Sequence, residues 1–526
     1  MRLKMITVCL LIVCMLASLT ACGDKSKKEV ISSEVKLAAD GVYPMECEDE
    51  LTIWCELTSS LSTRVSDFGE IPLADELEAR TGVKVSYVHP AQGQQTEQFN
   101  LMLASNELPD IISYGWPAYG AQAAIDNNYI LDITEMVDKW APNYKKYLTE
   151  IPESDRMSKT DSGAYYAFNF FRDNVGDCIY SGPIVRADLL EKVNLEVPQT
   201  IDEWEMVLRA FKNELNMSIP FSAAIGNLHW TFTGAFGILQ DIFVKDGKVV
   251  YGPATEEWRA YLTKMNKWYK EGLIDNNIAS FDKTAHNTNV LNNRVGATFG
   301  AASGGLGKWN NGANTKGFRM VGAPYPVMEK GAVPKFANQE MILGGDSYAI
   351  TTQCKNPELA VRFLDYGYGE EGRLLYNFGI EGKSFEFDEN GEPKIIEVID
   401  EDDKLDAGDM LLYAMGSYSG PFVQMTQVPA QLQASLPEVS PALELWKNNE
   451  FEQNRYPAVT YTIDEQTEMS NIRSEIKTYT NEMTMKFITG VESLDKFDAY
   501  IKQLDSFGLK RLLEIYTGAM DRYNNR

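Results

Sequence analysis

Histidine is the scarcest of the residues that commonly bind metals or carry catalysis in this chain. The 526 residues include only three histidines, His89, His229 and His286. They lie far apart in the sequence, and none belongs to a pair with the spacing of zinc ligands or to a recognisable triad motif. We therefore expect no metal site and no histidine-based catalysis, and the sequence indicates no cofactor.

Cysteine is also rare, with seven residues in the whole chain, three of them within the first 22 positions. The remaining four are Cys47, Cys55, Cys178 and Cys354. Four scattered cysteines in a chain of this length do not form the framework of a disulfide-stabilised fold. We expect them to behave as small buried hydrophobic residues.

Positive charge is under-represented, because 49 lysines and arginines face 75 aspartates and glutamates, for a formal net charge of −26. Such a surface repels phosphate backbones, so we expect no nucleic-acid partner. Beyond residue 21 no apolar run is long enough to span a membrane. A hydrophobic content of 44% and the chain length favour a packed protein of two or three domains.

The N-terminus carries the pattern of an export signal. Arg2 and Lys4 precede an apolar run over 6–19, which is shorter than the roughly 20 residues of a comfortable membrane span. The following Leu19-Thr20-Ala21-Cys22 resembles the lipobox of bacterial lipoproteins. That resemblance implies removal of residues 1–21, acylation of Cys22 and anchoring in the lipid bilayer at the extracellular face of the cell membrane. The alternative is an ordinary signal peptide followed by a chance cysteine.

Residues 22–47 are charged and small at their start and are interpreted as a tether. After them, apolar strand patterns alternate with helical patterns, which is typical of an open α/β sheet. The predicted strands are 51–55, 83–88 and 108–114, and the predicted helices between them are 73–80 and 99–106.

Several short motifs occur in an order that resembles family 1 extracellular solute-binding proteins, the receptor subunits of ABC importers. They are Glu-Leu-Pro-Asp-Ile-Ile at 107–112, Ile-Leu-Asp-Ile-Thr at 130–134, and the segments 185–190, 197–204, 356–360, 371–372, 379–383 and 519–523. The last two point to a subgroup of large Gram-positive lipoproteins related to alginate-oligosaccharide receptors. The resemblance implies a monomer that works with the membrane subunits of an ABC permease.

The same resemblance implies an α/β fold of the two-lobe periplasmic-binding-protein type, as in maltose-binding protein, with discontinuous lobes joined by a hinge. By analogy the first lobe takes residues 48–166 and 327–378, and the second takes 167–326 and 379–526. Capping boxes at Thr200-x-x-Glu203 and Thr462-x-x-Glu465 start two helices of the second lobe. The second of these begins a series of three C-terminal helices that we expect to pack on the second lobe.

Many members of the subgroup carry a calcium loop after the helix that here covers about 202–215. In this chain the connection is only residues 216–220, Asn-Met-Ser-Ile-Pro, without the alternating oxygen ligands that calcium requires. We therefore predict no calcium at this position. Residues 388–392, Asp-Glu-Asn-Gly-Glu, lie between alternating segments and are interpreted as a β-hairpin turn.

A sugar cleft combines aromatic faces with planar polar side chains, and the aromatic content of 11% supplies many candidates. We selected those in polar or glycine-rich segments instead of on helical stripes. The candidate ligand-binding residues are Tyr114, Trp116, Phe170, Arg172, His229, Trp230, Trp309, Glu340, Asp346 and Tyr418. For each of them the alternative is a packed aromatic or a solvated charge.

The sequence thus predicts a protein that captures a small-molecule solute, preferably an oligosaccharide, by closing two lobes without covalent chemistry. One alternative is an anchored glycoside hydrolase, because 75 carboxylates always provide some pair at a workable distance. Another is a ligand-sensing lipoprotein that serves no importer.

Overall fold

The computed structural model describes residues 42–526, except 59–60, 397, 401–402, 405–409, 411, 415–418 and 434–435. The predicted signal peptide, Cys22, most of the tether and Tyr418 lie outside these residues. Among the helices of the described part, none is both long enough and apolar enough to cross a bilayer.

The first sheet has six strands in the order β16-β4-β11-β3-β1-β2. Strand β1 pairs in parallel with β2 and β3, whereas β11 runs antiparallel to β3 and β4. The predicted strand–helix alternation is therefore confirmed, and the helices α2 and α3 connect the parallel strands as expected. The strands are β1 (Glu50–Trp54), β2 (Lys84–Val88), β3 (Ile111–Tyr114), β4 (Phe168–Arg172), β11 (Leu343–Ile350) and β16 (Val423–Gln424).

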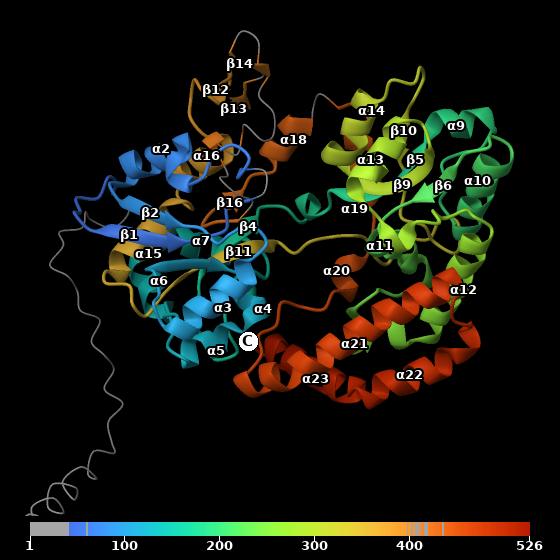
Figure 1. Cartoon of the computed structure of the whole chain (residues 1–526). Helices are drawn as coiled ribbons and strands as arrows, with labels where there is room; N and C mark the ends of the chain where they lie inside the picture. Colours follow the sequence, from blue (N-terminus) through green and yellow to red (C-terminus); the bar gives the residue numbers. More distant parts are fainter. Residues whose placement is uncertain are drawn as a thin grey trace, which may run out of the picture. The chain divides into compact units, whose positions relative to one another are not determined.

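Helices cover this sheet and form the first lobe with it (Figure 1). They are α2 (Pro72–Thr81), α3 (Gln95–Ser105), α4 (Trp116–Tyr119), α5 (Ala121–Asp126), α6 (Thr134–Trp140), α7 (Pro142–Glu150), α8 (Ser154–Met157), α15 (Pro357–Tyr366) and α16 (Glu370–Phe378). Two small hairpins follow in the chain. They are β12 (Phe385–Phe387) with β13 (Pro393–Ile395), and β14 (Val398–Asp400) with β15 (Asp403–Lys404).

The predicted turn at 388–392 is the tip of the first of these hairpins. Its strands pair antiparallel, and the Asp388 carboxylate accepts hydrogen bonds from the backbone N–H groups of Asn390 and Glu392. Gly391 has a φ of 80°, a conformation that glycine adopts without steric cost. The hairpin interpretation of this segment is confirmed.

The second sheet has four strands in the order β10-β5-β9-β6, with β6 and β9 parallel. The strands are β5 (Ser181–Arg186), β6 (Ile219–Ser222), β9 (Val295–Ala301) and β10 (Met320–Gly322), with a separate hairpin of β7 (Ile242–Lys245) and β8 (Lys248–Tyr251). The helices around it are α9 (Ala187–Lys192), α10 (Ile201–Asn213), α11 (Ile225–Phe232), α12 (Glu256–Lys270), α13 (Lys283–Leu291), α14 (Lys308–Gly312), α19 (Val439–Lys447) and α20 (Phe451–Asn454). Helix α18 (Gln427–Gln433) belongs with the first lobe, because Gln431 hydrogen-bonds the backbone of β13 and Val428 is part of the first core.

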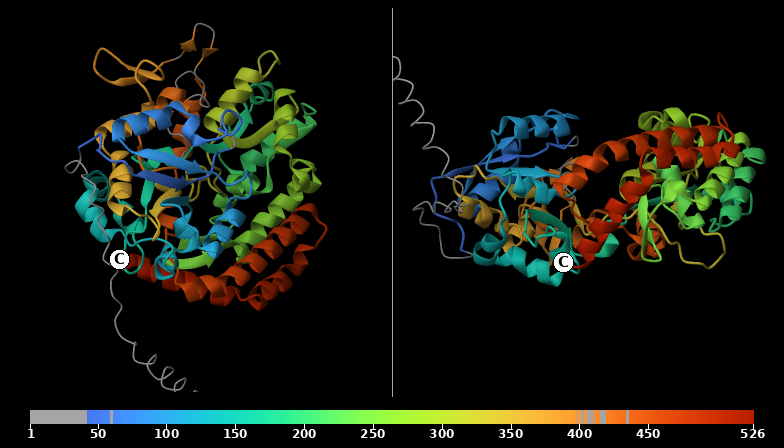
Figure 2. Two further views of the ribbon diagram at one scale, coloured as in Figure 1. Left: turned by 60° about the vertical axis from the view of Figure 1, so that its left-hand side comes forward. Right: turned by 90° about the horizontal axis from the view of Figure 1, so that it is seen from below.

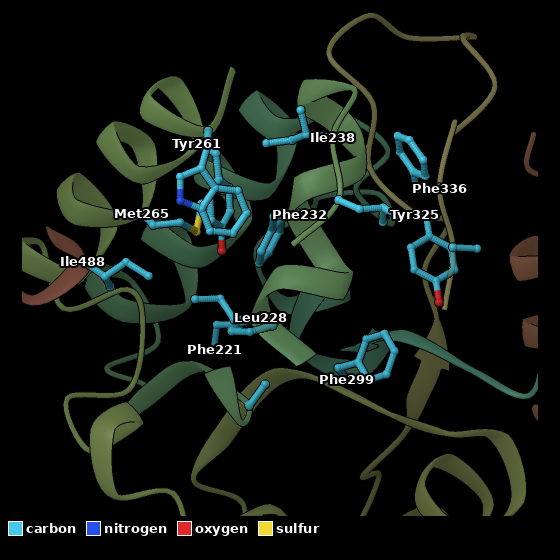
Figure 3. Packing of buried hydrophobic residues seen from close by; sticks show 14 of the residues in the cluster. Phe221, Leu228, Phe232, Ile238, Tyr261, Met265, Phe299, Tyr325, Phe336 and Ile488 are labelled. Atoms are coloured by element: carbon cyan, nitrogen blue, oxygen red, sulfur yellow. The ribbon is translucent and has the colours of Figure 1, made fainter. Parts of the chain in front are cut away.

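Aromatic rings fill the core of the second lobe (Figure 3). Phe232 of α11 lies edge-on to Trp204 of α10 and to Trp268 of α12, with ring centroids 5.6 and 5.1 Å apart. Both tryptophans are fully buried. Edge-to-face contacts of this kind add to the stability that burial itself provides.

Three helices, α21 (Ile463–Thr489), α22 (Phe497–Ser506) and α23 (Leu509–Asn524), pack on this core, which confirms the prediction for the C-terminal series. Figure 2 shows them in red and orange beside the green helices of the second lobe. The Thr462 capping box is present, and so is the one at Thr200. Helix α21 ends at Gly490, whose φ of 77° suits a left-handed cap.

The buried contacts divide the chain at different points from the predicted lobe boundaries. Strand β4, predicted in the second lobe, lies inside the first sheet between β11 and β16. The chain that follows residue 378 also stays with the first lobe as far as β16, because Phe422 stacks on Tyr376 and β16 pairs with β4. Conversely, Phe336 packs edge-on to Phe243 in the core of the second lobe.

Candidate functional site

A pocket of about 660 Å³ lies where the carboxyl end of β3 meets the first turns of α21. The elements that supply its residues, α3, α4, α5 and α21, are labelled in Figure 1. Most of its lining residues carry a polar group or an aromatic ring. They are Gln95, Thr96, Asn100, Tyr114, Gly115, Tyr119, Ala123, Asn127, Asp346, Ile463, Gln466, Thr467 and Ser470.

The sheet register explains why two of the predicted residues meet here. Tyr114 is the last residue of β3, and it pairs with Ser347 of the antiparallel strand β11. Asp346, the neighbour of Ser347 in the chain, therefore lies beside the end of β3. Carboxyl ends of strands are where open α/β sheets place their ligands.

Asp346 is the carboxylate of this pocket. Gln95 donates a hydrogen bond from Nε2 to Oδ2 of Asp346 at 3.1 Å, and the Asp346 backbone N–H donates to the hydroxyl of Ser419 at 2.9 Å. Burial raises the pKa of Asp346 above its ordinary value, the Gln95 hydrogen bond opposes the shift, and the charge of Glu56 adds to it.

Two tyrosines give the pocket aromatic character. The ring of Tyr114 stacks on Phe99 with centroids 3.6 Å apart and an interplanar angle of 8°. Tyr119 meets the same phenylalanine edge-on at 5.2 Å. Because Phe99 is fully buried, it holds both tyrosines in place, while each tyrosine remains half-buried at the pocket. Such rings can receive the C–H faces of a sugar.

Arg172 and Glu340 also meet, but at a different place. The Arg172 guanidinium donates to Glu340 at 2.5 Å and to the backbone oxygen of Met341 at 3.2 Å. Tyr180 donates its hydroxyl to the other Glu340 oxygen at 2.5 Å, and burial together with this carboxylate raises the pKa of Tyr180 to about 12. The three residues link the end of β4 to the start of β5, where the chain passes between the two sheets.

Four predicted residues are packed inside the lobes, and their assignment to an exposed site is corrected. Trp116 is fully buried and donates its indole N–H to the backbone oxygen of Ile112, and Phe170 is fully buried in the first core. His229 hydrogen-bonds the Tyr261 hydroxyl through Nδ1, and burial lowers its pKa to about 3. Trp309 is 4% exposed and donates to Asn287.

The glycines of Ala302–Gly307, after β9, form one wide helical turn that continues into α14 and directs the Trp309 indole inward. Trp230 is half-buried, with its ring 6.2 Å from Phe451, in the second lobe and not at the pocket. Tyr418 lies outside the described residues.

Sequence reasoning missed most of the polar lining residues. Gln95 begins the helix after β2, and Tyr119 follows three residues after Trp116, so proximity to strand ends could have indicated both. The residues of α21 could not have been found this way, because α21 begins more than a hundred residues after β3 and β11, the strands that supply the pocket.

A second pocket of about 790 Å³ lies in the second lobe, between α9, residues 319–334 and the start of α19. It is lined mainly by prolines and aliphatic side chains, and it contains none of the ten predicted residues. In the described part of the chain, no three histidine, cysteine, aspartate or glutamate side chains gather as a metal site.

Two α/β lobes, each with its own sheet and core, are the architecture of the two-lobe solute receptors. Residues 72–376 match the family described as bacterial extracellular solute-binding protein, and the chain belongs to this family.

Three relatives illustrate the similarity. The fructooligosaccharide ABC transporter substrate-binding protein FusA of Streptococcus pneumoniae is 26% identical over 97% of this chain and 96% of its own length. Lipoprotein LipO of Bacillus subtilis is 24% identical over 60% of this chain and 64% of its own length. The crystal structure of alginate-binding protein AlgQ2 without calcium superposes with a TM-score of 0.73 at 26% identity, covering 90% and 98% of the two chains.

Proposed function

We propose that this protein binds an uncharged oligosaccharide outside the cell and delivers it to the permease of an ABC importer. The observation that carries the proposal is the chemistry of the 660 Å³ pocket at the end of β3. Its amides and hydroxyls suit sugar hydroxyl groups, and its two tyrosines suit the apolar faces of sugar rings.

The charge of the pocket supports an uncharged solute. Among the described residues that line it, none is lysine or arginine, and Asp346 contributes a carboxylate. The chain as a whole carries a net charge of −26, which opposes the approach of an acidic glycan. FusA is named for fructooligosaccharides, which carry no charge, and this relative covers nearly the whole chain.

The proposed mechanism is closure of the two lobes around the solute. The pocket draws residues from the first sheet and from α21, whose stripe belongs to the second core, so a solute there contacts both parts. Lobe closure follows if the solute binds the closed form more tightly than the open one. No covalent step is part of this mechanism, and the protein acts as a monomer.

We propose further that Cys22 is acylated and anchors the protein at the outer face of the membrane. The Leu-Thr-Ala-Cys motif at 19–22 and the similarity to Lipoprotein LipO support this. Full-length protein expressed in bacteria should fractionate with membranes, and Cys22→Ala should release it or leave its signal uncleaved. Membrane fractionation and signal cleavage that are both unaffected by this substitution would argue against the anchor.

The test of solute class is a thermal-shift screen of the purified protein with neutral oligosaccharides, uronate oligosaccharides and peptides. A solute present at a hundred times its dissociation constant should add about 2.7 kcal/mol to the free energy of unfolding. We expect stabilisation by neutral oligosaccharides, with no release of smaller sugars on long incubation. Stabilisation by peptides or uronates alone would overturn the proposal, and turnover would favour a glycoside hydrolase.

A further inference from the structure

We propose that the first two turns of α21 form a wall that sets the length of oligosaccharide the pocket accepts. This inference rests on the proposed function. The wall consists of Ile463, Gln466, Thr467 and Ser470, which recur at helical spacing and line the pocket opposite the sequence-distant residues of the first lobe. A solute that fills the pocket therefore ends against, or passes along, a helix of the C-terminal series.

The wall lies directly on the first lobe. Gly120, between α4 and α5, has a φ of 106°, and a Cβ atom built there would lie 3.0 Å from the Gln466 amide nitrogen. A larger residue at 120 would be strained by this φ, and the end of the Gln466 side chain would have to shift by a few tenths of an ångström. Gly120 thus lets the Gln466 side chain lie directly against the first lobe.

A cluster of four charges holds the start of α21 against the first lobe. Glu465 accepts hydrogen bonds from the Arg522 guanidinium at 2.9 and 2.5 Å, and the Arg522 Nε donates to Asp161 at 2.6 Å. Arg526 also donates to Asp161, at 3.0 and 2.6 Å. Asp161 follows α8 of the first lobe, so the cluster ties α21 and α23 to that lobe.

The cluster is partly shielded from solvent. The Arg526 side chain is only 3% exposed, and it also donates to the backbone oxygens of Arg156 and Lys159. Two arginines face two carboxylates, so the charges balance and each guanidinium has several partners. In this conformation the cluster therefore holds the wall beside the pocket.

Ile463 and Thr467 are exposed side chains of this wall, one turn apart on one helical face. Enlarging Thr467 should shorten the space available to a solute without disturbing the core. Because Thr467 contributes only a side-chain hydrogen bond to the backbone of Ile463, its replacement should leave α21 folded.

The experiment measures affinity by titration calorimetry along a size ladder of neutral oligosaccharides, beginning with fructooligosaccharides, for the full chain and Thr467→Trp. We expect Thr467→Trp to weaken binding of the longest bound members at least tenfold while the shortest keep their affinity. Ile463→Ala should act in the opposite direction and improve binding of longer members. The matched control is Thr478→Trp, an exposed threonine three turns further along the same helix and outside the pocket.

Provided that the wild-type chain binds these oligosaccharides, the proposal of a length-limiting wall would be overturned if Thr467→Trp changed the affinity for all lengths equally or for none. Failure of the wild-type chain to bind any oligosaccharide would instead refute the proposed function itself. Ser470→Trp provides a second probe of the same wall if Thr467→Trp lowers the melting temperature.

Discussion

Asp346 is the residue most important to the proposed chemistry of the pocket. Burial raises its pKa, so it is more costly to ionise than a surface aspartate, while only its hydrogen bond from Gln95 compensates within the pocket. A sugar hydroxyl that donates to this carboxylate would form a charge-assisted hydrogen bond, which is stronger than one to a neutral amide.

Asp346→Asn should therefore weaken oligosaccharide binding about tenfold, or about 1.4 kcal/mol, because it replaces a charged acceptor with a neutral one of the same shape. Titration calorimetry measures the change. The control is Glu97→Gln, an equal change of charge on an exposed residue of α3 that does not line the pocket. Equal affinities of Asp346→Asn and wild type would remove Asp346 from the site.

Asp365 gives the protein a pH-dependent stability that is independent of the pocket. It accepts hydrogen bonds from the backbone N–H groups of Asn143 and Tyr144 at the start of α7, and it is 1% exposed. Burial outweighs these bonds and raises its pKa to about 7. Its folded pKa lies above the unfolded value of about 3.9, so the folded state binds the extra proton between these two values.

The free energy of unfolding contributed by Asp365 is thus fully present below about pH 4 and is lost as the pH rises through 7. Compared with Asp365→Asn, the wild type should lose stability between about pH 5 and pH 8. Urea unfolding of both proteins at pH 5 and pH 8 measures how much more the free energy of unfolding of the wild type falls with pH. Parallel pH profiles would show that Asp365 titrates normally.

At the residue scale, the sequence named Tyr114 and Asp346 as candidates, and both line the pocket at the end of β3. It failed for Trp116, Phe170, His229 and Trp309, because a glycine-rich or polar neighbourhood does not report whether a ring points inward. Burial is decided by packing partners such as Tyr261 and Asn287, which lie far away in the chain.

At the scale of elements, the helix starts were the most predictable features. The capping boxes at Thr200 and Thr462 are local patterns that satisfy backbone N–H groups without tertiary help, and both are present. The lobe boundaries were less predictable, because β4 and β16 are assigned by their pairing in the first sheet and not by their own sequence. The placement of α21 beside Gly120 likewise depends on long-range contacts.

The two capping boxes form a matched pair for a test of α21. Thr462→Ala and Thr200→Ala should each cost about 1 kcal/mol of stability, since each removes the hydroxyl that accepts from the N3 backbone N–H. Only Thr462→Ala should also weaken oligosaccharide binding, because fraying of α21 disturbs the wall. Denaturant unfolding and calorimetry on both variants separate the two effects. Equal loss of affinity in the two variants would contradict the role assigned to α21.

At the scale of the whole molecule, the chain passes between the sheets near Arg172, Tyr180 and Glu340. The two short hydrogen bonds of Glu340 tie the end of β4 to the residue before β5. Hinge motion is absorbed by a few residues at the ends of such elements. The cluster therefore lies where such motion would bend the chain, and solute contact by Arg172 and Glu340 stays a prediction.

Saturating neutral oligosaccharide should reduce the radius of gyration in small-angle scattering, since closure brings the lobes together. A uronate oligosaccharide at the same concentration should leave it unchanged. An identical scattering curve with and without a solute of proven affinity would show that binding does not require closure.

The most direct test of the central claim is a crystal structure with the neutral oligosaccharide that gives the largest thermal shift. We expect its hydroxyls to contact Asp346, its rings to lie against Tyr114 or Tyr119, and one end to approach Thr467 of α21. Electron density for the sugar in the apolar pocket between α9 and α19, with the pocket at the end of β3 empty, would contradict the account.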